Sequence, residues 1–90
     1  MSRISYASLR KITRYELARI LAVRALQLSL GAPPLINIDE VKKKDSYHIA
    51  LEEVRRKILP IVIKRRLPNG EEYIFSLRDL DIDLSGLDHG

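Results

Sequence analysis

The chain has 90 residues, with 16 lysines or arginines, 12 aspartates or glutamates and no cysteine. A chain of this length forms at most one domain and buries only about 60 to 65% of its unfolded surface, so its own core is small. Without cysteine it has no disulfide and no thiolate metal site, which suits a reducing compartment. No apolar run reaches the length of a membrane span and no signal-peptide pattern is present, so we expect a cytoplasmic protein.

Charge is distributed unevenly along the chain. The formal charge is +5 over residues 1–31 and +3 over residues 58–70, whereas residues 71–90 carry −5. Residues 1–12 mix serines with basic residues and show no sustained period, so we expect a flexible basic arm. Residues 79–90 mix aspartates with apolar residues, and we expect an acidic C-terminal tail outside the core.

A first helix is predicted within residues 13–31, with its own start and stop signals. Thr13 and Glu16 have the spacing of a capping box, in which each side chain binds the backbone N–H of the other residue. Gly31 can adopt the left-handed conformation that closes a helix, and the two prolines that follow cannot continue one.

The surface of this helix is unusually apolar. At about 100° per residue, small side chains form a narrow arc with bulky apolar side chains on both flanks. The arc contains Ala18, Ala22, Ala25 and Ser29, with Leu17, Leu21 and Leu28 on one flank and Tyr15, Leu26 and Leu30 on the other. A helix buried in the chain's own core would show the same pattern. The small size of the chain favours docking on another protein instead.

A second, amphipathic helix is predicted from about residue 47 to residue 57, after a short strand or extended segment at residues 35–38. Asp45 or Ser46 can cap the start of this helix. Apolar residues recur on one face, which we expect to pack against the first helix. Two pairs have the spacing of ion pairs on an exposed helix: Glu52 with Arg56, and Glu53 with Lys57.

A β-hairpin is predicted after the second helix. Pro60 ends the helix, residues 61–66 are rich in β-branched side chains, and residues 71–75 return as the partner strand. Residues 68–70 have the composition of a hairpin turn, in which Gly70 can adopt a positive φ. The expected fold is mainly α with a small β part (α+β): two helices, extended connections and a C-terminal hairpin.

Residues suited to catalysis or metal binding are scarce. His48 and His89 stand alone, and no carboxylate has a plausible catalytic neighbour. Asp79, Asp81 and Asp83 have a spacing that suggests calcium, but the chain lacks the glycine and the distal glutamate of an EF-hand loop. We therefore expect no catalytic site, no metal and no cofactor.

Nucleic-acid binding is the alternative function for a small basic protein. Residues 64–66 and residues 42–44 are basic runs that could touch phosphate, and Arg19 and Arg24 project from the first helix. A helix-turn-helix is disfavoured because prolines follow the first helix, which is apolar where a recognition helix is polar. Arg19 and Arg24 equally suit acidic residues of a partner protein. The alternative that stays open is a free-standing, small basic nucleic-acid-binding transcription regulator.

Two blocks of the sequence match a known family. The first consists of Thr13, Tyr15, Glu16, Ala18, Arg19, Arg24-Ala25-Leu26-Gln27 and Gly31-Ala32-Pro33. The second consists of Asp45, Ile49-Ala50, Glu53, Pro60-Ile61, Ile63, Arg65 and Leu67-Pro68-Asn69-Gly70. In this order they resemble archaeal RNA polymerase subunit K, the counterpart of bacterial omega and of the small subunit shared by the eukaryotic polymerases. We therefore divide the chain into the arm at 1–12, an omega-like domain at 13–78 and the tail at 79–90.

The resemblance implies a non-catalytic subunit of multisubunit DNA-dependent RNA polymerase. Such a subunit is folded against a larger partner, clasps the largest polymerase subunit and promotes assembly and stability of the enzyme. The implied state is a hetero-oligomer, with DNA or RNA contacted only indirectly or through minor phosphate contacts, and without a membrane. One departure is that many relatives carry glycine shortly before the proline matched by Pro60, where this chain has Arg56-Lys57-Ile58-Leu59.

We expect the docking residues to come from the apolar arc and from the two matching blocks. They are Thr13, Tyr15, Glu16, Ala18, Arg19, Leu21, Ala22, Arg24, Ala25, Leu26, Gln27, Leu28, Ser29, Gly31, Pro33, Pro60, Ile61, Ile63, Arg65, Leu67, Pro68 and Gly70.

Overall fold

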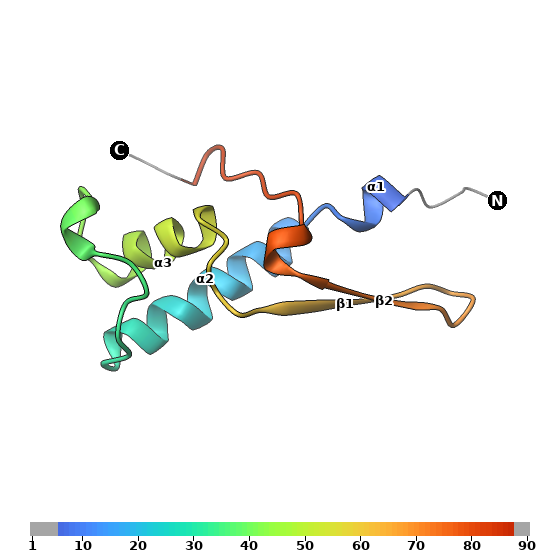
Figure 1. The fold of residues 1–90 in the computed structure, drawn as a ribbon, viewed down its shortest axis with the longest axis horizontal. Helices are drawn as coiled ribbons and strands as arrows, with labels where there is room; N and C mark the ends of the chain where they lie inside the picture. The colour runs from blue at the N-terminus through green and yellow to red at the C-terminus, as the bar shows by residue number, and fades with distance from the viewer. Residues whose placement is uncertain (1–5, 88–90) are drawn as a thin grey trace.

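The computed structural model describes residues 6–87 and has the expected α+β fold. In chain order its elements are α1 (Tyr6–Leu9), α2 (Arg14–Ser29), the 3-10 helix η1 (Ile38–Glu40), α3 (Ser46–Arg55), β1 (Val62–Arg66), β2 (Glu72–Ser76) and the 3-10 helix η2 (Leu77–Asp79). The two long helices, α2 and α3, lie against each other, and the hairpin extends away from them (Figure 1). The molecule is consequently elongated, with principal extents of 48 × 24 × 17 Å. Within residues 6–87, no helix is long and apolar enough to cross a membrane.

The ends of α2 form as its sequence predicts. The Glu16 N–H donates to Thr13 Oγ1 over 3.1 Å, and the Thr13 N–H donates to Glu16 Oε1 over 2.9 Å, which completes the capping box. At the other end Gly31 has a φ of +106°. Its N–H donates to the Leu28 carbonyl, and the next N–H, of Ala32, donates to the Gln27 carbonyl, so the last turn is closed by a Schellman motif.

The second helix, α3, begins after Asp45, one of the two caps that the sequence allowed. Asp45 Oδ1 accepts from the His48 N–H over 2.9 Å, and this hydrogen bond holds the pKa of Asp45 below its ordinary value. The helix ends with a second Schellman arrangement, in which Lys57 takes the left-handed position with a φ of +56°. A residue with a side chain is strained in this conformation. Lys57 Nζ donates to the Leu80 carbonyl over 2.7 Å and offsets part of this strain.

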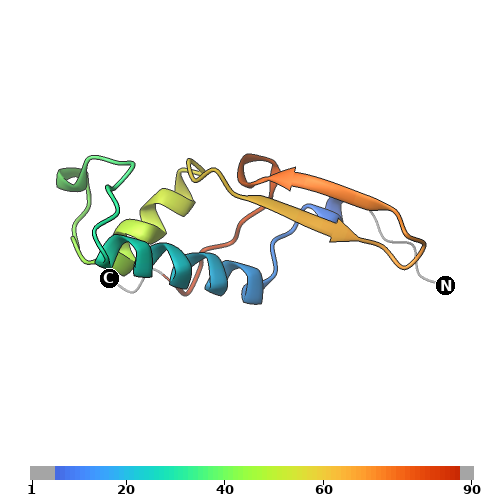
Figure 2. The same cartoon turned by 90° about the horizontal axis from the view of Figure 1, so that it is seen from below.

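The hydrophobic core lies between α2, α3 and the base of the hairpin (Figure 2). Its buried members are Leu17, Leu21, Ala50, Leu51, Val54, Leu59, Phe75, Leu77 and Leu80. Fully burying one such leucine stabilises a fold by about 1.5 to 3 kcal/mol relative to leaving it exposed. Because Leu77 and Leu80 belong to this cluster, the segment after the hairpin is part of the core.

The hairpin has the predicted turn, and each strand begins one residue later than expected. Strands β1 and β2 pair antiparallel from Val62 opposite Ser76 to Arg66 opposite Glu72. In the turn Gly70 has a φ of +92°, which residues other than glycine rarely adopt. The expected strand or extended segment at residues 35–38 forms no strand; the chain enters η1 there, and Asn37 Oδ1 caps it by accepting from the Asp39 N–H.

Both expected terminal segments contact the rest of the chain. The Asp81 N–H donates to the Arg10 carbonyl over 2.7 Å, and the Ile12 N–H donates to the Asp81 carbonyl over 3.1 Å, which forms a short parallel bridge. Leu80 is fully buried. The boundaries expected after residue 12 and before residue 79 therefore do not coincide with a change in packing. Residues 1–5 of the basic arm and residues 88–90 of the acidic tail, including His89, lie outside the described part of the chain.

Candidate docking surface

The apolar surface predicted on α2 consists of the arc of small residues and its two bulky flanks. One flank lies inside the chain and the other lies outside. Leu17 and Leu21 are buried in the core, whereas Leu26 is 59% exposed and Leu30 is 79% exposed. Tyr15, at the start of the same outer side, is 90% exposed. Large apolar residues therefore lie on two opposite sides of α2, one side buried in the core and the other exposed.

We define the outer face of α2 by Tyr15, Ala18, Ala22, Leu26, Ser29 and Leu30, all of which are exposed. These positions fall at three- and four-residue spacing and share one side of the helix. Leu21, expected to be a docking residue, is instead 3% exposed in the chain's own core, and Leu28 and Ala25 pack against that core. Only the flank with Tyr15, Leu26 and Leu30 is therefore available to a partner, because the other flank packs in the chain's own core.

Arg24 and Glu53 form a buried ion pair that fixes the second half of α2. Arg24 Nε lies 2.6 Å from Glu53 Oε1 and Nη2 lies 3.0 Å from Oε2, while Glu53 is completely buried. The remaining polar capacity is also used: Glu53 Oε2 accepts from the Leu35 N–H over 2.7 Å, and Arg24 Nη2 donates to the Pro33 carbonyl. The hydrogen bond that Arg24 donates to the Glu53 carboxylate raises the pKa of the Arg24 guanidinium.

Two expectations about these side chains are wrong. Glu53 pairs with Arg24 and the Lys57 ammonium binds the Leu80 carbonyl, so the predicted pair of Glu53 with Lys57 does not form. Arg24 is occupied within the chain and does not project toward an external acid. The sequence did contain a signal for the buried pair, because Glu53 lies four residues after Ile49 and three after Ala50, on the buried side of α3. The predicted pair of Glu52 with Arg56 does form, over 2.9 Å.

Arg65 joins the hairpin to the start of α2. Its Nε donates to the Leu9 carbonyl over 3.1 Å and its Nη2 to the Lys11 carbonyl over 2.9 Å, while Nη1 pairs with Glu16. Burial raises the pKa of Glu16, but the hydrogen bonds from Arg65 and from the Thr13 N–H outweigh burial and hold that pKa below its ordinary value. Arg65 is therefore a structural residue, and the basic run at the hairpin does not act as one cationic patch.

An open apolar groove of about 660 Å³ lies between α2 and the chain leading into β1. One wall is Ile20 and Val23 of α2, and the other runs from Leu59 to Ile63. The groove brings together expected docking residues from both sequence blocks: Glu16, Arg19, Arg24, Gln27, Pro33, Pro60, Ile61 and Ile63. The chemical character of this groove suits an apolar segment of another chain.

The remaining expected docking residues lie at the helix ends and in the hairpin turn. Thr13 and Gly31 cap α2, and Leu67, Pro68 and Gly70 lie where β1 turns back toward β2, with the Gly70 N–H bound to the Leu67 carbonyl. These positions have evident local roles in ending α2 and reversing the hairpin. Val23, which is not among the expected docking residues, is 51% exposed and lines the groove.

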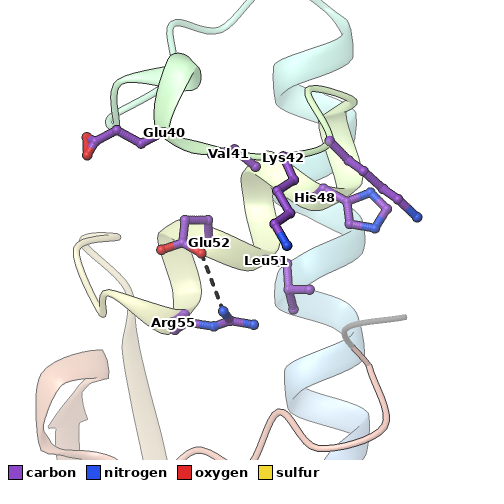
Figure 3. A pocket seen from close by; sticks show the side chains of 8 residues that line it. Glu40, Val41, Lys42, His48, Leu51, Glu52 and Arg55 are labelled. Atoms are coloured by element: carbon purple, nitrogen blue, oxygen red, sulfur yellow. Dashed lines mark ion pairs between the residues drawn. The ribbon is translucent and has the colours of Figure 1, made fainter. Parts of the chain in front are cut away.

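A second hollow, of about 380 Å³, lies between residues 40–43 and α3 (Figure 3). Acidic and basic side chains both line it, and Glu52 and Arg55, about one turn apart on α3, approach within 3.6 Å of each other. Glu52 also pairs with Arg56, which in turn reaches Glu40 over 3.6 Å. The mixture of charges gives this hollow no clear preference for an anion or a cation.

Among the described residues, the histidine and two of the aspartates considered in the sequence analysis have local hydrogen-bond partners. His48 Nδ1 lies 2.6 Å from Asp45 Oδ2 at the start of α3, where both groups are committed to the cap. Within residues 6–87 no three histidine, aspartate or glutamate side chains are grouped to hold a metal ion. Asp79 accepts from Ser76 Oγ and Asp83 accepts from the Ser85 N–H, so these carboxylates act in local turns.

Comparison with known proteins gives a consistent result. The family model described as RNA polymerase Rpb6 matches residues 10–61. The DNA-directed RNA polymerase subunit Rpo6 of Saccharolobus islandicus is 54% identical over 68 residues, which are 76% of this chain and 72% of the relative. The subunit of the same name from Sulfolobus acidocaldarius is 49% identical over 71 residues, which are 79% of this chain and 80% of the relative.

A eukaryotic relative extends the comparison. The DNA-directed RNA polymerases I, II, and III subunit RPABC2 of Saccharomyces cerevisiae is 41% identical over 73 residues, which are 81% of this chain and 46% of the relative. The sequence resemblance to archaeal subunit K and its eukaryotic counterpart is thereby confirmed. The chain belongs to the RNA polymerase Rpb6 family.

Proposed function

We propose that the chain is a non-catalytic subunit of a multisubunit DNA-dependent RNA polymerase, and that it promotes assembly and stability of the enzyme by clasping the largest subunit. Membership of the Rpb6 family supports the polymerase assignment. The observation that carries the docking mode is the outer face of α2, where Leu26 and Leu30 remain exposed in the free chain. Contiguous exposed apolar residues of this kind are typical of an interaction surface.

The outer face is suited to close helix packing. Ala18 and Ala22 are small and exposed, so a partner backbone can approach α2 between the larger side chains of Tyr15 and Leu26. The partner would cover these side chains and recover the burial energy that the free chain leaves unused. We assign this partner to the largest subunit and retain the adjacent groove as a second contact with the polymerase.

The basic side chains support the alternative of a free-standing nucleic-acid-binding regulator less well. Arg24 and Arg65 are bound within the chain, and Lys64 lies 2.8 Å from Glu72. Internal pairing reduces the number of phosphate charges that these side chains can neutralise. Contacts to nucleic acid within the polymerase would accordingly be minor.

The test is co-purification of variants with the largest polymerase subunit. Replacing Ala22 by tryptophan places a bulky group on the outer face without entering the core, so we expect loss of co-purification with a nearly unchanged melting temperature. Arg78→Trp is the matched control, because Arg78 is exposed on η2 and outside the outer face. Co-purification of Ala22→Trp at the wild-type level would contradict the docking assignment.

A further inference from the structure

The hairpin leaves one edge of each strand without a partner. Among residues 6–87, β1 and β2 form a sheet of two strands only. The Leu67 N–H binds the Glu71 carbonyl and the Leu77 N–H binds the Ile61 carbonyl, at the two ends of the ladder. In an antiparallel pair, hydrogen-bonded positions alternate with positions whose backbone groups point away from the partner strand.

This alternation determines which groups face the free edge of β1. Because residues 61 and 67 bond across to the neighbouring strand, the intervening bonded positions are 63 and 65. The backbone N–H and C=O groups of Val62, Lys64 and Arg66 therefore point away from β2. On β2, for the same reason, the backbone N–H and C=O groups of Ile74 point toward the opposite edge of the sheet. An unpaired edge of this kind is a template for another strand.

The free edge of β1 begins beside the apolar groove. Val62 is 62% exposed and forms part of the groove wall opposite Ile20 and Val23. An extended segment paired with β1 would place some of its side chains against this wall while its backbone bonded to Val62 and Lys64. The backbone groups of the edge thus specify an extended conformation, which the apolar groove alone would not.

The outward side of β1 carries unbalanced positive charge. Lys64 Nζ lies 2.8 Å from Glu72 Oε2, and Arg66 Nε lies 3.7 Å from the same oxygen. One carboxylate therefore serves two cations on this face. A strand added at the free edge would have its side chains directly beside Lys64 and Arg66, where acidic residues are favoured over basic ones.

We propose that the free edge of β1 binds an extended segment of another polymerase subunit by β-strand addition, with apolar side chains directed into the groove and an acidic side chain beside Lys64 or Arg66. This inference rests on the proposed function and specifies the conformation and chemistry of one bound segment. It uses a surface that adjoins the outer face of α2 but requires backbone hydrogen bonds that a helix face does not offer.

Proline substitution tests the edge directly, because it removes one backbone N–H. In Lys64→Pro the lost N–H points to the free edge, so the bonds between β1 and β2 are retained. Ile74→Pro is the matched control, since Ile74 is directly opposite Lys64 and its N–H points to the other edge. Lys64→Thr removes the charge and keeps the N–H.

The variants of the full chain are assembled with the remaining polymerase subunits, and their retention is measured by competition with the wild-type chain. We expect Lys64→Pro to be retained about ten-fold less well, the effect of one lost hydrogen bond that leaves a buried carbonyl unpaired. Ile74→Pro should remain within about two-fold of the wild type, and Lys64→Thr should lose less than Lys64→Pro. Thermal melts of the free variants verify that both proline chains fold.

Several outcomes would overturn the inference. These are wild-type retention of Lys64→Pro, equal losses for the two proline variants, or a loss in Lys64→Thr as large as that in Lys64→Pro. A second measurement is independent of substitution: hydrogen exchange at the Lys64 and Arg66 amides should slow on assembly, and unchanged exchange there also overturns it. If the wild-type chain itself does not enter the polymerase, the proposed function fails. If the wild-type chain enters and one of the outcomes above is found, only the inference of strand addition fails.

Discussion

The two sides of α2 carry the same kind of residue in different surroundings. Leu17 and Leu21 are covered by α3 and the hairpin base, whereas Leu26 and Leu30 are left open on the opposite side. Burial of a leucine contributes about 1.5 to 3 kcal/mol only when something covers it. One helix can therefore serve two functions, because its inner side stabilises the chain and its outer side is available to a partner.

The inner side should be most sensitive at the buried ion pair. Glu53→Ala leaves the Arg24 guanidinium and the Leu35 N–H without their partner in a nearly dry environment. We expect the free energy of unfolding to fall by about 3 to 5 kcal/mol, measured by urea denaturation. The neighbouring Glu52→Ala is the control and should cost less than about 1 kcal/mol, because its ion pairs are partly exposed. Equal losses would contradict the structural role of the buried pair.

A pair of identical truncations compares the two sides directly. Leu21→Ala removes a buried side chain and should lower the free energy of unfolding of the free chain by about 2 to 5 kcal/mol. Leu26→Ala removes an exposed one and should change it by less than about 0.5 kcal/mol while weakening assembly with the polymerase. Chemical denaturation gives the first quantity and competitive assembly the second. If Leu26→Ala left assembly unchanged, the outer face would lose its assigned function.

The smallest expected effect is a pH dependence at the start of α2. The folded-state pKa of Glu16 lies below the ordinary value of 4.5, so the ionised carboxylate stabilises the fold above that value. This contribution is lost as the pH falls through the folded-state pKa. Glu16→Gln should therefore be less stable than the wild type at pH 7, and the difference should shrink in acid. Parallel denaturation curves at several pH values measure it, and a difference that grew in acid would have the wrong sign.

Sequence reasoning succeeded where structure depends on neighbouring residues. The capping box of Thr13 and Glu16, the left-handed Gly31 and the cap at Asp45 are each determined within a few positions, and all three form as predicted. The hairpin was predicted to within one residue because its turn composition and its β-branched strand are also local signals.

The features missed by the sequence analysis depend on contacts between distant residues. Arg24 and Glu53 are 29 positions apart, and only the packing of α2 on α3 brings them together. Leu80 was placed in an acidic tail because aspartates surround it, yet it is completely buried. Arg65 was grouped with its basic neighbours, although the two-residue period of a strand directs it to the opposite face from Lys64. Helical periodicity predicted the apolar arc and its two flanks but could not tell which flank the chain itself would cover.

The absence of cysteine from the sequence permits the most direct test of the outer face. A single cysteine introduced at Ala22 would be the only thiol in the chain, and its rate of modification by a maleimide can be measured in the free chain and in the assembled polymerase. We predict rapid modification in the free chain and strong protection after assembly, while a cysteine at Arg78 reacts at similar rates in both. Equal reactivity of the Ala22 position before and after assembly would contradict docking through the outer face of α2.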